Sequence, residues 1–185
     1  MTRRPLVGEP LALDLVNTQW AERGRMVDLF DEPDGLRGWL AEHHLESDPA
    51  AVETPLRETR SALRRVLEQP DEAAERGVNA ILARGASGYT LRKGAVQERH
   101  EVDAGWLPSW RAAINYLDLL RQQPHRIRRC GNPACVLHFY DTSRNGTRRW
   151  CSMDGCGARA KAARHYQRQR VTPTAQRQEH GVRVD

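Results

Sequence analysis

Apolar positions in the first 124 residues recur at the spacing of amphipathic helices. In the segment "LALDLVNTQWAER" they form one broad helical face, made by Leu11, Leu13, Leu15, Val16, Thr18 and Trp20. In "DEPDGLRGWLAEHHL" a second apolar series begins at Leu36, and either Asp31 or Asp34 can cap the helix that carries it. We therefore expect two helices at the start of the chain.

Three more helices and a hairpin are expected before residue 124. Thr54 and Pro55 open the helix "TPLRETRSALRRVLEQ", because proline fits the first helical position. Asp71 caps a helix that ends near "ARGASG". The runs "YTLRKG" and "AVQERHEV", joined at Gly94, predict a β-hairpin. The helix "LPSWRAAINYLDLLRQQ" follows and ends at Pro124, where we place a domain boundary.

The charge changes sign at about the same place. Residues 1–120 hold 15 Lys and Arg against 20 Asp and Glu, whereas residues 121–185 hold 14 against 4. We therefore expect a helical regulatory domain (residues 1–124), a basic module (residues 125–170) and a disordered tail (residues 171–185). A basic module of this kind favours a polyanionic partner.

The sequence predicts a cytoplasmic protein with no membrane partner. No run approaches the roughly 18 apolar residues of a spanning helix. Glu9 and Asp14 interrupt the one apolar stretch that resembles a signal peptide. In the cytoplasm structural disulfides are rare, so the cysteines need another explanation.

All four cysteines lie in the basic module, as the pairs Cys130 with Cys135 and Cys151 with Cys156. This C-x4-C-x15-C-x4-C spacing can bring four thiolates to one tetrahedral Zn²⁺. The alternatives are two disulfides or four unrelated buried thiols, which an intracellular chain disfavours. Because four cysteines leave no open coordination position, we expect the zinc to be structural.

The residues around the cysteines predict a treble-clef-like finger. The arm between the two pairs contains Asn145 and Gly146, a strong hairpin signal, and the second pair leads into a basic helix. His138 and His165 could replace a cysteine as ligand, but we assign His138 to strand packing and His165 to a solvated helix face. The fold class we expect is mainly α, with some β structure.

At these residues the sequence resembles a known family. The segment "RIRRCGNPACVLHFYDTSRNGTRRWCSMDGCGARAKAARHYQRQR" closely resembles the CGNR zinc finger, and "GEPLALDLVNT" resembles the opening of the ABATE domain. That domain precedes the finger in bacterial proteins regarded as stress-induced transcription regulators, so the resemblance implies a regulator. The family's Cys-Gly-Asn-Arg reads here as Cys156, Gly157, Ala158 and Arg159, so the hydrogen bonds of that asparagine are absent.

The helix after the second cysteine pair is the candidate nucleic-acid reader. Lys161, Arg164, His165 and Arg168 recur at helical spacing and form one polar stripe. Arg159, in the first turn, is the candidate for a base contact. The candidate nucleic-acid contacts are Arg148, Arg159, Lys161, Arg164 and Arg168. The alternatives are an ordinary solvated face, or arginines that only neutralise the zinc–thiolate cluster, as Arg129 and Arg149 would.

In the acidic domain, Asp14, Asn17 and Thr18 fall on one helical face among leucines. They could line a small-molecule pocket; the alternative is that they hydrogen-bond within the protein at a tight junction. No nucleophile–base pair, Gly-rich phosphate loop or paired carboxylates occur, so we expect no enzyme.

The leading hypothesis is therefore a transcription regulator with a zinc finger that binds duplex DNA. Its N-terminal domain would bind a small-molecule effector, form a homodimer, or both. A zinc-stabilised module that docks a protein or an RNA is the main alternative, and an enzyme of unknown chemistry is the other.

Overall fold

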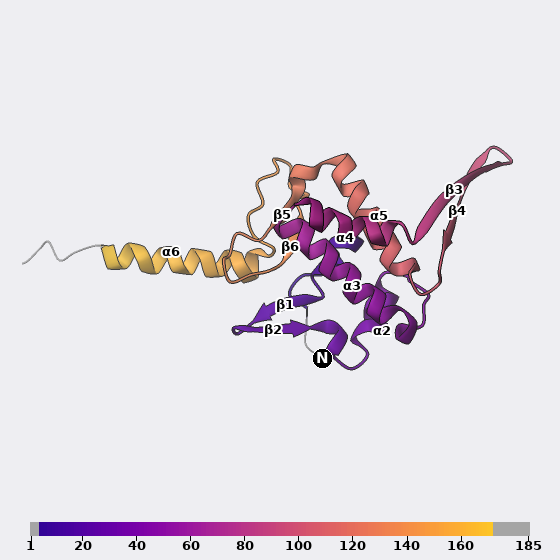
Figure 1. The fold of residues 1–185 in the computed structure, drawn as a ribbon. Coiled ribbons are helices and arrows are strands. Elements are labelled where there is room, and N and C mark those ends of the chain that lie inside the picture. Colours follow the sequence, from indigo (N-terminus) through magenta and orange to yellow (C-terminus); the bar gives the residue numbers. More distant parts are fainter. Residues whose placement is uncertain (1–3, 172–185) are drawn as a thin grey trace, which may run out of the picture.

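The computed structural model describes residues 4–171, which form a mainly helical body with antiparallel strand pairs (Figure 1). Its helices and strands are α1 (Leu11–Val16), β1 (Gln19–Glu22), β2 (Arg25–Asp28), α2 (Gly35–Glu42), α3 (Pro49–Glu68), α4 (Glu72–Leu82), β3 (Gly85–Arg92), β4 (Ala95–Val102), α5 (Leu107–Gln122), β5 (Ile127–Arg129), β6 (His138–Tyr140) and α6 (Ala158–Val171). The predicted fold class, mainly helical with some β structure and a C-terminal cysteine cluster, is confirmed. The predicted tail lies outside the described residues, apart from Val171.

α1 is the centre of the main core. Its residues from Ala12 to Val16 are buried, and it packs against α3 and α5. The larger side chains that close the core around it include Trp39, Leu40, Val52, Leu56, Leu63, Val78, Ile81 and Tyr116. The apolar spacing in the sequence thus identifies the faces of α1 and α2 that enter this core.

The prediction that the first helix continues to Trp20 is wrong. α1 ends at Val16, and β1 and β2 form a hairpin that the sequence analysis missed. Its turn residues, Arg23 and Gly24, both have positive φ, as a two-residue turn between twisted strands requires. Arginine is an uncommon residue in that conformation, which is why the turn carries no sequence signal.

The start of α3 is also corrected. The helix begins at Pro49 after Asp48, whose side chain accepts from the Ala50 N–H at 3.1 Å. Pro55, the predicted first residue, lies inside the helix. Two other local signals are borne out: Asp71 caps α4 by accepting from Ala74 N at 2.7 Å, and Gly94 lies in the β3–β4 turn. Asp34 precedes α2, but its side chain forms no capping hydrogen bond.

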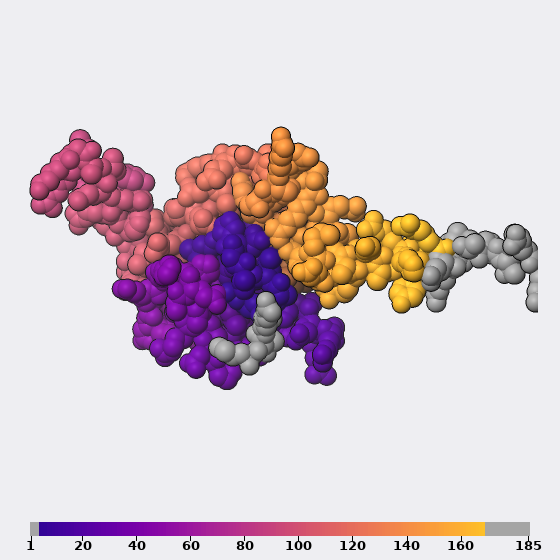
Figure 2. Space-filling view, turned by 180° about the vertical axis from the view of Figure 1, so that it is seen from behind, coloured from indigo at the N-terminus to yellow at the C-terminus, as the bar shows by residue number. Residues whose placement is uncertain are grey.

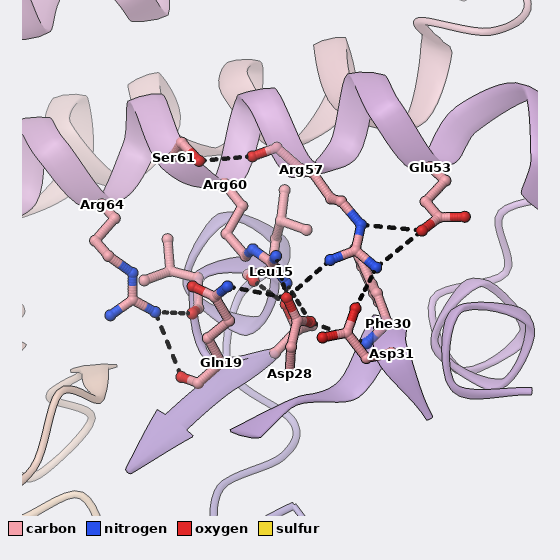
Figure 3. A network of polar contacts seen from close by, with 12 residues as sticks. Leu15, Gln19, Asp28, Phe30, Asp31, Glu53, Arg57, Arg60, Ser61 and Arg64 are labelled. Atoms are coloured by element: carbon pink, nitrogen blue, oxygen red, sulfur yellow. Dashed lines mark hydrogen bonds and ion pairs between the residues drawn. The ribbon is translucent and has the colours of Figure 1, made fainter. Parts of the chain in front are cut away.

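A buried ion network fixes the β1–β2 hairpin to α3 (Figure 3). Asp28, at the end of β2, accepts from both terminal nitrogens of Arg60, at 2.7 and 2.5 Å, and from Arg57 at 2.9 Å. Arg64 extends the network by donating to the Val16 carbonyl at 2.6 Å. The hydrogen bond to Arg60 and its charge hold the pKa of Asp28 below its usual value, although burial alone would raise it.

Two elements project from opposite ends of the body. α6 extends from one end, and the β3–β4 hairpin from the other, as Figures 1 and 2 both show. Among residues 4–171, no helix combines the length and the apolar composition needed to cross a bilayer.

Candidate metal centre and nucleic-acid interface

The four cysteines converge on one point between β5, β6 and α6. Their Sγ atoms all lie within 4.8 Å of one another, and all four residues are buried. Cys151 Sγ lies 3.8 Å from Cys135 Sγ and 3.7 Å from Cys156 Sγ. A tetrahedral Zn²⁺ with Zn–S bonds of about 2.3 Å separates its sulfurs by about 3.8 Å, so the donor set fits zinc.

The backbone around each pair is shaped to present the thiolates. Cys130 follows β5, and its N–H donates to the Leu137 carbonyl at 2.9 Å, so β5 and β6 flank the first knuckle. The second knuckle is a π-helical turn, Met153–Gly157, which Ser152 caps by accepting from Gly155 N. The hairpin predicted at Asn145–Gly146 is wrong. That segment is an irregular turn, and the paired strands enclose the first cysteine pair instead.

Hydrogen-bond donors around the cluster stabilise the deprotonated, thiolate form of the cysteines. Asn132 Nδ2 lies 3.3 Å and Arg159 Nη2 3.1 Å from Cys156 Sγ. A hydrogen bond from Cys151 lowers the pKa of Cys135 to about 5, whereas burial raises the pKa of Cys130. Four neighbouring thiolates repel one another, and a bound dication removes that repulsion. The site is therefore a structural zinc site, whose ion holds the two knuckles together.

The apolar cluster around the cysteines includes the N-terminal region. Trp20 of β1 is buried among the cysteines with Leu137 and Phe139, and Leu6 and Val27 pack against the same cluster. The finger therefore completes its core with residues more than a hundred positions earlier in the chain. Sequence reasoning missed Trp20 because nothing local distinguishes this contact from an ordinary helix face.

Asn17 joins α1 to the finger directly. Its side-chain amide donates to the His138 carbonyl at 2.7 Å, and its carbonyl oxygen accepts from the His138 N–H at 3.0 Å. The amide thus pairs with β6 as a neighbouring strand would. Glu9 adds a second link by accepting from the Tyr140 N–H at 2.8 Å.

The imidazole of His138 lies beside this junction. It is buried and is not one of the clustered ligands, which agrees with strand packing. Neither ring nitrogen has a hydrogen-bond partner among the described residues. Burial, with the nearby charges of Arg64 and Arg129, lowers the pKa of His138 to about 4.

Replacing His138 with leucine is expected to stabilise the protein, and more so in mild acid. The change removes an unpaired buried polar group, which costs about 1–3 kcal/mol. When the pH falls from 7.5 to 5.5, the free energy of unfolding of the wild type decreases by about 1.4 kcal/mol more than that of the variant. The reason is that unfolded histidine (pKa near 6.5) takes up a proton that folded His138 does not. Urea unfolding of both proteins in saturating zinc at the two pH values measures this difference. A His138→Leu advantage independent of pH would contradict it.

Arg148 is engaged inside the protein. Its guanidinium lies over the Phe139 ring, 4.2 Å from the centroid, and donates to the carbonyls of Trp150 at 3.0 Å and Cys151 at 2.5 Å. These contacts orient the segment that enters the second knuckle. We therefore remove Arg148 from the candidate nucleic-acid contacts and assign it a structural role.

The remaining candidates lie together on α6. Lys161, Arg164 and Arg168 are exposed, as is every residue from 161 to 168. Residues 161–168 therefore do not pack on the body, and the helix extends away from it (Figure 1). Arg159 is exposed at its first turn, although one of its nitrogens faces Cys156. α6 is thus an exposed basic helix that extends from the finger, and it is not part of the core.

A groove of about 500 Å³ runs beneath the start of this helix. Its walls are the β1–β2 turn, the first knuckle and α6, and its lining includes Arg23, Asn132, Trp150, Arg159 and Ala163. Two arginines and an indole face this space, and none of the described lining residues carries a carboxylate. The sequence analysis did not identify Arg23 or Asn132, since only the fold brings them to the helix.

The three residues expected to line an effector pocket are buried instead. Asp14 accepts from Arg4 at 2.5 Å, Trp39 Nε1 at 2.9 Å and the Gly8 N–H at 3.2 Å, and it contacts His43 Nε2 at 3.0 Å.

Thr18 donates to the Leu15 carbonyl and accepts from Arg60, while Asn17 pairs with His138. These contacts agree with the alternative interpretation, in which the three residues form hydrogen bonds within the protein. Each of the three side chains contacts a different part of the fold. We therefore assign no ligand pocket to Asp14, Asn17 and Thr18.

The fold and site define a helical domain joined to a four-cysteine zinc finger. Comparison with protein families matches residues 126–169 to the CGNR zinc finger. Residues 9–123 match the ABATE family, described as "Putative stress-induced transcription regulator", and the chain belongs to this family. No match was found among curated proteins.

Proposed function

We propose that this protein is a transcription regulator of the cytoplasm that binds duplex DNA through α6 and the groove beneath it. The family description supports a role in transcription. The observation that carries the DNA contact is the exposure of α6 on a zinc-stabilised base. Regular spacing of cations along an exposed helix suits contact with phosphates on either side of a groove.

The charge distribution supports a contact with nucleic acid over the alternative that the cations only neutralise the zinc–thiolate cluster. Arg159 and Asn132 already contact the thiolates, whereas Lys161, Arg164 and Arg168 lie further along a helix that leaves the site. No Asp or Glu occurs between residues 155 and 178. A helix that carries several cations away from the metal, in a stretch without carboxylates, supports a polyanionic partner.

Replacing Lys161, Arg164 and Arg168 together with alanine tests this proposal. Each stripe residue should neutralise about one phosphate, so the triple variant should reduce the salt dependence, d log K/d log[salt], by about 2.7. The measurement is fluorescence anisotropy with duplex DNA at several salt concentrations. Zinc content and the melting temperature should not change, because these side chains are exposed.

The matched control removes the same charge elsewhere. Arg37, Arg76 and Arg111 are exposed cations on α2, α4 and α5, and replacing them with alanine should leave the slope unchanged. If the stripe and control variants bind duplex DNA equally well, α6 is not the reader. Preferential binding of single-stranded RNA, or of neither nucleic acid, would favour the docking-module alternative.

A further inference from the structure

The β3–β4 hairpin carries an apolar face that nothing in the described chain covers. Tyr89 is 68% exposed, Leu91 75% and Val96 72%. Leu91 pairs with Val96 across the strands, and Tyr89 lies two positions along, so the three side chains lie on one face. Large apolar side chains gathered in this way mark an interaction surface.

The same face is covered where the hairpin leaves the body. His100 packs against Trp110 of α5, with 5.1 Å between ring centroids, and Gly85 lies against the same indole. Positions 85, 87, 89 and 91 share this face. The inner half of the hairpin thus packs against α5, while the outer half extends beyond the body of the protein (Figures 1 and 2).

An isolated two-stranded hairpin of this length is marginally stable in water. Both of its long edges are also free, since β3 and β4 pair only with each other. Two adjacent left-handed residues, Lys93 and Gly94, fix its turn and register. The hairpin is therefore preformed for binding, and its outer half requires a partner to bury Tyr89, Leu91 and Val96.

Charges along the hairpin indicate which partner fits. The tip carries Arg92 and Lys93, and no acidic residue occurs between 86 and 97. The next stretch, residues 98–103, holds Glu98, Glu101 and Asp103 with a single arginine. Lys93 lies at the turn and Glu98 on the apolar face, whereas Arg92 and Glu101 lie on the opposite face. An antiparallel arrangement of two such hairpins places Lys93 of each copy beside Glu98 of the other. This reciprocal pairing is the pattern of a two-fold, self-complementary interface.

We infer that the outer halves of two β3–β4 hairpins pack face to face and join two copies of this chain into a homodimer. The apolar side chains form the centre of the contact. Lys93 at the tip of each copy meets Glu98 of the other, so these charges form the rim. Helix α6 lies at the far end of each copy and stays uncovered.

The first test replaces the centre of the contact. Leu91→Glu with Val96→Glu should convert the dimer into a monomer in sedimentation equilibrium of the full-length, zinc-loaded protein. Thr90→Glu with Gln97→Glu is the matched control, because this pair carries the same charge change on the opposite face of the same strands. The control should remain dimeric. A monomeric wild type, or equal behaviour of the two double variants, would overturn the proposal.

A charge exchange tests the antiparallel arrangement. Lys93→Glu reverses the charge of the tip, and Glu98→Lys reverses the charge of the base that the tip meets. Each variant alone should dissociate at least tenfold more readily than wild type, because its tips and bases then have like charge. An equimolar mixture should recover the dimer, because both tip–base contacts are again complementary. Failure of the mixture to associate would exclude this arrangement, whatever the DNA-binding result.

Discussion

Replacing Cys151 with serine is expected to release the zinc and unfold the finger. Cys151 Sγ lies within 4.8 Å of the other three Sγ atoms, with which it would hold the ion, and its N–H donates to Cys130 Sγ at 3.5 Å. Structural zinc supplies about 10–16 kcal/mol to small fingers. The three-residue strands β5 and β6 and the irregular arm cannot replace that contribution.

The effect should extend beyond the finger. Trp20, Leu6 and Val27 pack on the cysteine cluster, so unfolding the finger exposes them. The helices of the main core should persist, because α1, α3 and α5 pack on one another, but they should melt at a lower temperature. Elemental analysis, circular dichroism and tryptophan fluorescence measure the three effects. Met153→Ser is the control, since Met153 is exposed beside the knuckle. An intact finger in Cys151→Ser would contradict the assignment.

Replacing Asp14 with asparagine should destabilise the N-terminal domain by about 3–5 kcal/mol. Asp14 is fully buried and neutralises Arg4, which is itself buried. Asparagine keeps the size of the side chain but leaves the exposed carboxylate of Glu42 as the remaining counter-charge of that guanidinium. Burial alone would raise the pKa of Asp14, but the hydrogen bond to His43 and the charge of Arg4 hold it below its usual value.

The pH dependence distinguishes this effect from that of His138. A lowered carboxyl pKa contributes stability that is fully present above the unfolded pKa of about 3.9 and is lost only as pH falls through the folded value. The cost of Asp14→Asn should therefore be the same at pH 7.5 and 5.5 in urea unfolding. Glu42→Gln, which removes the exposed partner of Arg4, should cost less than about 1 kcal/mol. Equal costs for the two variants would contradict the role of Asp14.

Features with local causes could be predicted from the sequence. The cysteine spacing identifies the zinc ligands, because a knuckle needs only a few residues to present two thiolates. Asp71 and Gly94 identify a helix start and a hairpin turn for the same reason. Pro55 did not mark the helix start, because proline favours the first turn of a helix, and in α3 that position is occupied by Pro49 while Pro55 lies inside the helix.

Features that depend on distant partners could not be predicted. Helical spacing placed Asp14, Asn17 and Thr18 on one face, yet each meets a different neighbour that only the fold brings near. Arg148 and Arg159 are both arginines of a basic module, and their partners, a ring and a thiolate, distinguish their roles. Charge and composition describe what a surface can bind, but not which of its cations are already engaged.

The amide pair between Asn17 and β6 makes metal binding and domain folding reciprocal. Whatever stabilises α1 in its native position also holds β6 in place and thereby raises the affinity of the cysteines for zinc. Zinc in turn stabilises α1, a helix that contributes no zinc ligand. This stabilisation increases with the logarithm of the free zinc concentration. The affinity of this finger for its metal is thus a property of the whole chain, and a molecule that binds the N-terminal domain would change it.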